Sequence, residues 1–387
     1  MGDGHLLLGL VGDVLVDRED PPEVFSKVQP VLDAVDVLFG NLEGPYTDDA
    51  HAPPSAPVQV IPPARNLGVY ARCGFDVVTM ANNHIVDGGH AAMLDTRARL
   101  NRQGVATCGA GRNLAEARAP ALVEAGGLKL AFLGYASIFP SGYEARSAVP
   151  GIAPMRAHNV YMDAYDNYHA PGCEPRVKTV PFEEDVENLR EDIAGARERA
   201  DLVIATFHWG DFMKPFHLTD HELRTARFCI DEGADMVVGH HHHVLRGMEW
   251  YAGKPILYGL GHFVFDLRVE LPPDLLKMIE GSGEDPDFYG VAPREGWPLL
   301  PLHAESRMTL MAWASVEAGS IAGIGFVPCM LRPDGLVHPV DPESPEGREV
   351  VAYVEKGCTT QNLNARVVRA ELELGGCPAM QVVPADS

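Results

Sequence analysis

Basic residues are scarce in this chain. Its 387 residues include 31 Lys and Arg against 54 Asp and Glu, so the formal net charge is −23. A field of that sign repels nucleic acid and anionic membranes, and no stripe of Lys and Arg reverses it locally. We therefore expect a protein that binds neither nucleic acid nor a membrane surface. The same field attracts metal cations.

Paired cysteines and long apolar segments are missing as well. The seven cysteines are scattered and form no Cys-x-x-Cys pair, a pattern typical of reduced thiols in a cytoplasmic protein. The first apolar run, residues 6–11, is too short to span a bilayer. Neither a basic segment before it nor a small-residue cleavage site after it marks a signal peptide. We expect a cytoplasmic location and interpret this run as the first strand.

The composition is that of an ordinary globular protein, with 46% hydrophobic and 22% charged residues. Residues 1–387 contain no internal repeat or clear linker, so we treat them as a single domain. In the first half, short apolar runs alternate with helical stretches, which is the pattern of parallel β-α-β units and an α/β fold. We expect strands at 5–12, 36–39 and 77–80, and helices at 21–35 and 89–103.

The second half continues this pattern with two interruptions. Thr219 and Glu222 form a capping box at the start of a helix that Gly233 closes. The stretches 139–182 and 267–304 are rich in Pro, Gly, Tyr and charge, so we expect irregular insertions that serve as substrate-binding loops or a lid. The remaining expected elements are hairpins at 120–136 and 244–265, helices at 183–200 and 344–357, strands at 202–207, 235–238 and within 306–342, and an irregular or short-stranded tail.

Chemistry-bearing side chains lie at the ends of the expected strands. In open α/β sheets, ligands bind outside the carboxyl ends of the strands, so residues far apart in sequence can meet there. Carboxylate, amide oxygen and imidazole groups are suitable ligands for Mn, Fe, Zn or similar ions. The residues at these ends are Asp13, Glu43, Asn83, His208 and the run His240-His241-His242-His243.

The histidine run is the most specific of these features. On an extended segment side chains alternate, so His241 and His243 would point to one side, and His240 and His242 to the other. A carboxylate such as Asp13 could bridge two ions. Two ions about 3.5–4 Å apart can polarise an oxygen and generate hydroxide near neutral pH. We therefore expect two divalent metal ions.

Each of these residues alone also has an ordinary structural explanation. A Gly-Asp or Asn-Asn pair after a strand is commonly a turn, and His208 alone could be a hydrogen-bonded core histidine. Consecutive histidines are rarer, and metal binding is the leading explanation for such tracts. The five strand-end positions together are far more specific than any one of them.

Five motifs, in order along the chain, resemble the CapA-type (poly-γ-glutamate capsule synthesis) family, a relative of the calcineurin-like metallophosphoesterases. The likeness covers about 5–90 and 200–266. The motifs are Gly12-Asp13 with Arg18, Gly40-Asn41-Leu42-Glu43, Asn82-Asn83-His84 with Asp87-Gly88-Gly89, His208-Trp209-Gly210, and Gly239-x-His241-x-His243-Val244. The segment from Gly253 to Asp266 is also similar to the family.

The resemblance implies a four-layer α/β/β/α sandwich and roles for single residues. His84 would act as an acid or base beside the metals, and Asp87 would either orient it or cap a helix. Arg18 would bind a substrate carboxylate or phosphate, or form a surface salt bridge, and Trp209 would contact the substrate. The implied metal ligands are Asp13, Glu43, Asn83, His208, His241 and His243.

Three positions depart from the residues usual in this family. His242 stands where proline is common, and His262 stands where asparagine is common. Leu15 occupies the place of the histidine in the Asp-x-His pair of many phosphoesterases. Many capsule proteins also carry an anchor or export signal, which this sequence does not indicate. We therefore do not expect a role at the cell envelope.

The resemblance and the cytoplasmic character favour a peptide epimerase. Cytoplasmic members of this group include enzymes that invert the C-terminal residue of a ribosomally made lasso-peptide precursor. Metals would bind the terminal carboxylate or amide oxygen and stabilise the enolate left after removal of the α-proton. Inversion needs acid–base groups on both faces of the α-carbon, so we expect His84 on one face and His262 or an aspartate on the other.

Two other functions remain as alternatives. A hydrolase would use the same metals to direct water at a phosphoester or an amide, with His84 protonating the leaving group. A polymer-binding module without catalytic activity is disfavoured by the intact ligand set. Residue spacing alone does not separate the epimerase from the hydrolase.

Removal of a ligand tests the predicted site. We expect Asp13→Ala and His241→Ala each to abolish activity and lower the metal content of the purified protein, because each removes a donor of the two-metal site. Metal content is measured by inductively coupled plasma mass spectrometry. Full metal content in both variants would contradict this site.

Overall fold

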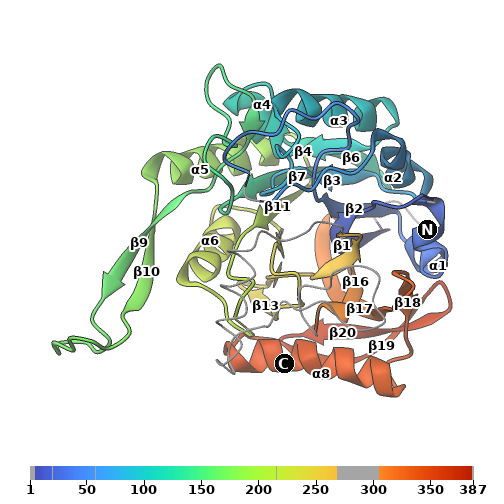
Figure 1. Ribbon diagram of the computed structural model, residues 1–387. Coiled ribbons are helices and arrows are strands. Elements are labelled where there is room, and N and C mark those ends of the chain that lie inside the picture. The colour runs from blue at the N-terminus through green and yellow to red at the C-terminus, as the bar shows by residue number, and fades with distance from the viewer. Residues whose placement is uncertain (1–4, 20, 57, 215, 268–304, 386–387) are drawn as a thin grey trace.

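Two β-sheets packed against each other form the centre of the protein, and helices cover their outer faces (Figure 1). The two sheets share one hydrophobic core, in which the Phe39 ring stacks on the Phe132 ring with centroids 5.4 Å apart. This is the α/β/β/α order that the family resemblance implies. The computed structural model describes residues 5–19, 21–56, 58–214, 216–267 and 305–385.

The larger sheet has the strand order β19-β20-β17-β16-β1-β2-β3-β4, with β15 also beside β1 and β18 beside β17. Strands β1 to β4 run parallel, whereas β16, β17, β19 and β20 pair antiparallel with their neighbours. The strands are β1 His5–Leu15, β2 Val37–Leu42, β3 Val77–Thr79, β4 Ala106–Cys108, β15 His262–Phe265, β16 Met308–Glu317, β17 Ser320–Leu331, β18 Val337–Pro339, β19 Arg366–Leu374 and β20 Cys377–Val383.

The smaller sheet has the order β13-β14-β12-β11-β7-β6, and its central strands β7, β11, β12 and β14 run parallel. Two further pairs lie outside the sandwich sheets, β5 with β8 and β9 with β10. The strands are β6 Ala121–Ala125, β7 Leu128–Ala136, β11 Leu202–His208, β12 Met236–His240, β13 Met248–Tyr251, β14 Lys254–Leu257, β5 Ala110–Gly111, β8 Gly151–Ile152, β9 Ala157–Met162 and β10 Arg176–Pro181.

Helices on the two outer faces complete the layers. Helices α1 to α3 cover the larger sheet through a second core, while α5 and α6 pack on β7, β11 and β12 of the smaller sheet. No helix in the described part of the chain combines the length and apolar character needed to cross a bilayer. The helices are η1 Pro21–Phe25, α1 Gln29–Leu32, η2 Ala64–Gly68, α2 Val69–Arg72, α3 His90–Arg102, α4 Leu114–Arg118, α5 Glu183–Arg197, α6 Asp220–Asp231, η3 Glu305–Arg307 and α8 Pro345–Thr360.

Local sequence signals account for most of these elements. The predicted capping box starts α6: the backbone N–H of Thr219 donates to Glu222 Oε2 at 2.6 Å, and the Thr219 hydroxyl accepts from the Glu222 N–H at 3.3 Å. The predicted hairpin between β6 and β7 turns at Gly126 and Gly127, whose φ angles of +58° and +78° suit a tight hairpin turn. These predictions are confirmed.

Three predicted elements are wrong in extent. The helix expected over 21–35 is divided into η1 and α1, because Pro30 has no N–H to donate and its ring would clash with the preceding turn. The hairpin expected over 244–265 is limited to β13 and β14, and β15 crosses to pair with β1 in the larger sheet. The tail, expected to be irregular or short, forms the long antiparallel pair β19 and β20, which β17 extends.

The insertion expected to be irregular over 139–182 contains ordered strands. β9 and β10 form a two-stranded ribbon that projects from the body of the protein (Figure 1). Several large side chains of this ribbon and of the loop that joins its strands are exposed, among them Tyr161 in β9 and Tyr165 and Tyr168 in the loop. Most of the other expected insertion, 267–304, lies outside the described residues.

Packing between the two sheets can be tested at Phe132, which is fully buried. We expect Phe132→Ala to lower the free energy of unfolding by about 3–5 kcal/mol, because it removes a buried ring and leaves a cavity at the sheet interface. Urea unfolding followed by circular dichroism measures this. Leu122→Ala on the neighbouring strand β6, where the side chain is 39% exposed, is the control and should stay within about 0.5 kcal/mol of the native value. Equal losses in the two variants would contradict the packing described here.

Candidate metal centre

The parallel strands of both sheets end at one edge, where the predicted site residues gather. β1 runs through Asp13 instead of ending before it, and Asp13 pairs with His262 of β15 on one side and Asn41 of β2 on the other. Gly12 allows this close approach, since a Cβ there would lie 1.9 Å from the carbonyl oxygen of Gly261. The crossing of β15 into the larger sheet therefore brings His262 to the site.

Three buried side chains form the middle of this site. One ligand atom each from Asp13, Glu43 and His208 lies within 4.8 Å of the other two. Asn41 donates its amide N–H groups to Asp13 Oδ1 at 2.8 Å and to Glu43 Oε2 at 2.5 Å. It was not among the predicted site residues. The available sequence signal is its place two residues before Glu43, which puts both side chains on one face of an extended segment.

Asp13 and Glu43 each have one carboxylate oxygen that accepts no hydrogen bond from the described residues. These atoms, Asp13 Oδ2 and Glu43 Oε1, are both buried. Burial raises the pKa of Glu43 well above its usual range, and the charge of Asp13 raises it further. Burial also acts to raise the pKa of Asp13, but His240 and His243 together outweigh it and hold this pKa well below its usual range. A divalent cation would compensate both buried oxygens, so this donor set fits one.

A second group of donors adjoins the carboxylates at His208. His208 Nε2 lies 2.7 Å from Asn83 Oδ1 and 3.1 Å from His241 Nδ1. Burial lowers the pKa of His208 and of His241 well below the usual range, and neighbouring imidazoles lower both further. Both rings are therefore neutral at pH 7, which is the form that ligates a metal.

The histidine run forms a turn, so the prediction of an extended segment is wrong. β12 ends at His240, and His241 and His243 have left-handed φ angles of +95° and +58°. Both rings still face the site, with His243 Nδ1 3.4 Å from Asp13 Oδ2. The expected alternation fails for His240, whose Nδ1 lies only 3.6 Å from Asp13 Oδ1. His242 does point elsewhere, to a buried glutamate of α6.

His262 stands at one end of the cluster. Its Nε2 lies 2.6 Å from His243 Nδ1, and its ring stacks on Phe265 with centroids 4.0 Å apart. His262 is 2% exposed. The imidazole therefore belongs to the buried side of the site, next to Asp13 in the strand register.

His84 stands at the other end and is held by Asp87. His84 Nδ1 lies 2.8 Å from Asp87 Oδ2, and its Nε2 lies 3.1 Å from the Asn83 amide nitrogen. Asp87 is itself fixed, because it accepts from the Val60 N–H at 2.8 Å and from the Tyr143 hydroxyl at 2.7 Å. Of the two roles considered for Asp87, this geometry matches orientation of His84, since the N-cap of α3 is Gly89 without a side-chain cap.

Tyr143 lies in the insertion that the sequence analysis treats as irregular, and nothing in the local sequence marks it as a site residue. Its hydroxyl donates to Asp87 Oδ1, and burial raises the pKa of this tyrosine above its usual range. The tyrosine therefore keeps its proton and serves as a donor to the carboxylate that holds His84.

The two residues expected to bind substrate have other roles in the structure. Arg18 forms a two-pronged ion pair with Asp266 and also donates to the carbonyl oxygen of Gly335 at 3.0 Å. A salt bridge was the alternative predicted for Arg18, but this one is largely buried and not at the surface, because the Asp266 side chain is 0% exposed. Trp209 is fully buried, stacks on Phe207 at 4.6 Å and donates from its indole N–H to a main-chain carbonyl. Trp209 is a core residue, because its side chain packs into the hydrophobic core just after β11.

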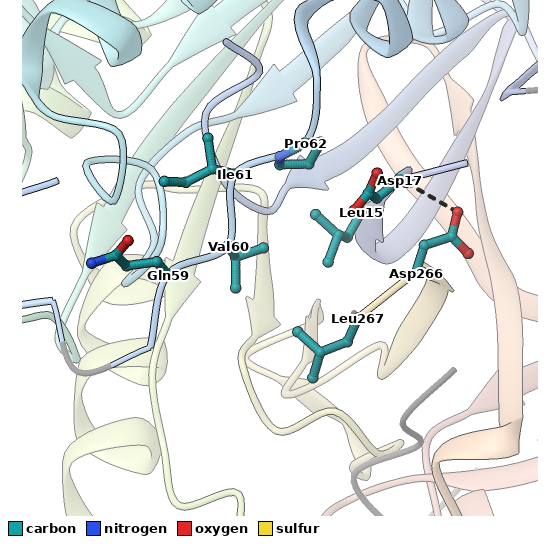
Figure 2. Close-up of a pocket in the computed structure, with 8 residues that line it drawn as sticks. All are labelled: Leu15, Asp17, Gln59, Val60, Ile61, Pro62, Asp266 and Leu267. Carbon is teal, nitrogen blue, oxygen red and sulfur yellow. Dashed lines mark hydrogen bonds between the residues drawn. The ribbon is translucent and has the colours of Figure 1, made fainter. Parts of the chain in front are cut away.

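A hollow of about 270 Å³ borders this edge of the sheet (Figure 2). Leu15 ends β1 and Leu267 follows β15. Val60, whose backbone N–H donates to Asp87, lines the hollow from a loop. Asp17 contributes polar surface, and its backbone N–H donates to Asp266 at 3.1 Å. The full lining consists of Leu15, Asp17, Gln59, Val60, Ile61, Pro62, Asp266 and Leu267.

Fold and site together define an α/β sandwich of the metallophosphoesterase type with a candidate centre of carboxylate, amide and imidazole donors. The sequence model of the family described as bacterial capsule synthesis protein PGA_cap matches residues 7–267, more than half of the chain. The chain belongs to this family. The matched segment includes every candidate ligand and ends just after β15.

Two of the curated relatives have names that refer to PGA biosynthesis or polyglutamine synthesis. The chain is 28% identical over 265 residues to the PGA biosynthesis protein CapA of Bacillus subtilis, covering 68% of this chain and 62% of that protein. It is 31% identical over 238 residues to a probable polyglutamine synthesis accessory protein of Mycobacterium tuberculosis, covering 60% and 56%. An uncharacterized protein of Sinorhizobium fredii is 27% identical over 392 residues, covering 85% and 83%. The chain thus spans less than two thirds of the first two relatives.

The stability of the buried carboxylate pair gives a test of metal binding. In the absence of metal, we expect the unfolding temperature of Glu43→Gln to equal or exceed that of the native protein, because the amide removes a buried like-charge neighbour of Asp13. With Mn²⁺ added, native protein should gain about 2.7 kcal/mol at a hundredfold excess over Kd, and the variant should gain much less. Differential scanning calorimetry with and without chelator measures both effects. An equal gain in both proteins would contradict a role for Glu43 in binding.

Proposed function

We propose that this chain is a metal-dependent enzyme that inverts the α-carbon of the C-terminal residue of a peptide. The observation that carries the proposal is the position of two imidazoles, His84 and His262, at opposite ends of one continuous row of side chains. Between them lie Asn83, His208, His241 and His243, linked by the contacts described above. Inversion requires a proton acceptor on one side of a carbon and a proton donor on the other.

His84 is suited to proton transfer with a bound molecule. Its side chain is 14% exposed, whereas the side chain of Asp87 is fully buried. The carboxylate at Nδ1 fixes the ring, which leaves Nε2 as the atom that faces a bound molecule. The pair Tyr143 and Val60 keeps Asp87 in place during proton transfer.

His262 is the matching group on the buried side. Its contact with His243 and its stacking on Phe265 fix the ring plane. Divalent ions held by the carboxylate, amide and imidazole donors would polarise a carbonyl oxygen and stabilise the negative charge that develops when an adjacent carbon loses its proton. One of His84 and His262 would then accept that proton, and the other would donate its own proton to the opposite face of the carbon.

A peptide substrate is supported by surfaces outside the donor cluster. The hollow beside Leu15, Val60 and Leu267 has the volume of a large side chain. The ribbon of β9 and β10 and the loop that joins its strands expose Tyr161, Tyr165 and Tyr168, and tyrosine provides contact area at low entropic cost. The names of two relatives refer to the making of PGA and of polyglutamine, and a polymer of amino acids is closer to a peptide than to a phosphoester.

Hydrolysis is the second candidate, and the exposure of His84 favours it. A hydrolase needs one acid at the open side of the site to protonate a leaving group, and the imidazole of His84 is placed for that task. The metal donors would serve either reaction. The two functions differ in whether His262 takes part in proton transfer.

Solvent exchange separates the two functions. Metal-loaded protein is incubated in deuterated water with synthetic peptides that differ in their C-terminal residue. We expect the C-terminal residue of a substrate peptide to gain one mass unit without cleavage of the chain, because the imidazole that reprotonates the α-carbon delivers a deuteron taken from the solvent. Mass spectrometry and chiral analysis of the hydrolysed peptide measure this. Absence of exchange in all peptides, together with turnover of bis(p-nitrophenyl) phosphate, would overturn the proposal.

Matched variants test the two imidazoles separately. His84→Asn and His262→Asn should each slow inversion by about a hundredfold or more. Each variant keeps one imidazole, which faces one side of the α-carbon. One variant should therefore still exchange the α-proton of a peptide that ends in an L-residue, and the other variant should still exchange the α-proton of a peptide that ends in a D-residue. Native metal content in His84→Asn is the control for an intact site.

A further inference from the structure

We infer that His242 is a positioning residue of the candidate metal centre. Its side chain, turned away from the site and bonded to Glu222, fixes the turn on which His241 and His243 stand. The inference rests on the proposed metal-dependent function and adds to it a residue that takes no part in ligation or proton transfer.

The turn requires a restraint. His241 and His243 both occupy the left-handed region, at φ +95° and +58°, which side chains with a Cβ adopt only when the surroundings impose it. A relaxed backbone at these positions would move both rings. His241 would then lose its place 3.1 Å from His208, and His243 its place 3.4 Å from Asp13.

The ring of His242 fills a slot that two glycines leave open. His242 is 1% exposed, and its Nε2 lies 2.7 Å from Glu222 Oε1. A Cβ on Gly210 would lie 2.2 Å from this Nε2, and a Cβ on Gly259 would lie 2.6 Å from the Nδ1 atom of the same ring. Any side chain at either glycine would therefore displace the ring. The two glycines therefore make the space that the ring occupies.

Glu222 is a rigid anchor for that ring. It is fully buried. Its other oxygen, Oε2, accepts from the Thr219 N–H at 2.6 Å and from the Thr219 hydroxyl at 2.7 Å. The same carboxylate thus caps α6 and holds His242. Because Gly210 lies two residues after His208, the contact joins α6 to both segments that carry imidazole donors, and it sets their relative position.

The test measures the affinity of the full chain for Mn²⁺ by competition with a chromophoric chelator. We expect His242→Ala to weaken binding about tenfold or more, in the range found for partners that orient metal ligands. Glu222→Gln should stay within about threefold of native, because glutamine still accepts from Thr219 and can donate its amide N–H to His242 Nε2. Native affinity in His242→Ala would overturn the inference, and so would a loss in Glu222→Gln as large as that in His242→Ala.

A matched control separates positioning from general destabilisation. Leu189 is fully buried in α5 and contacts the core of the smaller sheet, so Leu189→Ala should lower the unfolding temperature without weakening Mn²⁺ binding. Equal weakening in Leu189→Ala and His242→Ala would contradict a positioning role.

Failure of the metal centre itself is a distinguishable result. In that case the native protein binds no Mn²⁺, and the crystal structure of His242→Ala decides the inference. We expect the turn at 241–243 to relax and the His241 ring to leave His208. A turn that keeps both left-handed residues and the contact between His241 and His208 would overturn the inference.

Discussion

Two carboxylates buried side by side are the constraint on which the rest of this structure depends. Asp13 and Glu43 are both fully buried, and each keeps one oxygen without a hydrogen bond among the described residues. Burial of two like charges is unfavourable unless compensating groups surround them. Asn41 supplies amide donors to both, and the imidazoles of His240 and His243 approach Asp13. A divalent cation would compensate the two carboxylate oxygens that have no hydrogen bond.

The centre depends on the packing of two sheets and not on either sheet alone. The larger sheet supplies the carboxylates from β1 and β2, and the smaller sheet supplies imidazoles from β11 and β12. Contacts such as Phe39 on Phe132 set the separation of the sheets, and the crossing of β15 from one sheet to the other adds His262. The chain thereby brings residues more than 200 positions apart into contact around Asp13.

The partly exposed side of the site, at His84, is held by elements that are not strands of the sandwich. Asp87, which orients His84, takes its own hydrogen bonds from Tyr143 and Val60 in two loops. These loops lead to the ribbon of β9 and β10 and to the hollow of Figure 2. Changes in the loops would therefore move His84, while the buried carboxylates would keep their geometry.

Local periodicity and residue type were enough to predict an α/β protein, most of its strands and the polar residues at the strand ends, whereas the family and the four-layer sandwich came from the resemblance of its motifs. The sequence by itself did not determine where side chains point beyond the strand ends. His240 faces Asp13 and His241 sits in a left-handed turn, contrary to simple alternation. Trp209 is a core residue and Arg18 pairs with Asp266, although both belong to recognisable motifs. Only the tertiary structure decided these outcomes, because turn conformations and ion pairs between distant segments are set by packing across the two sheets.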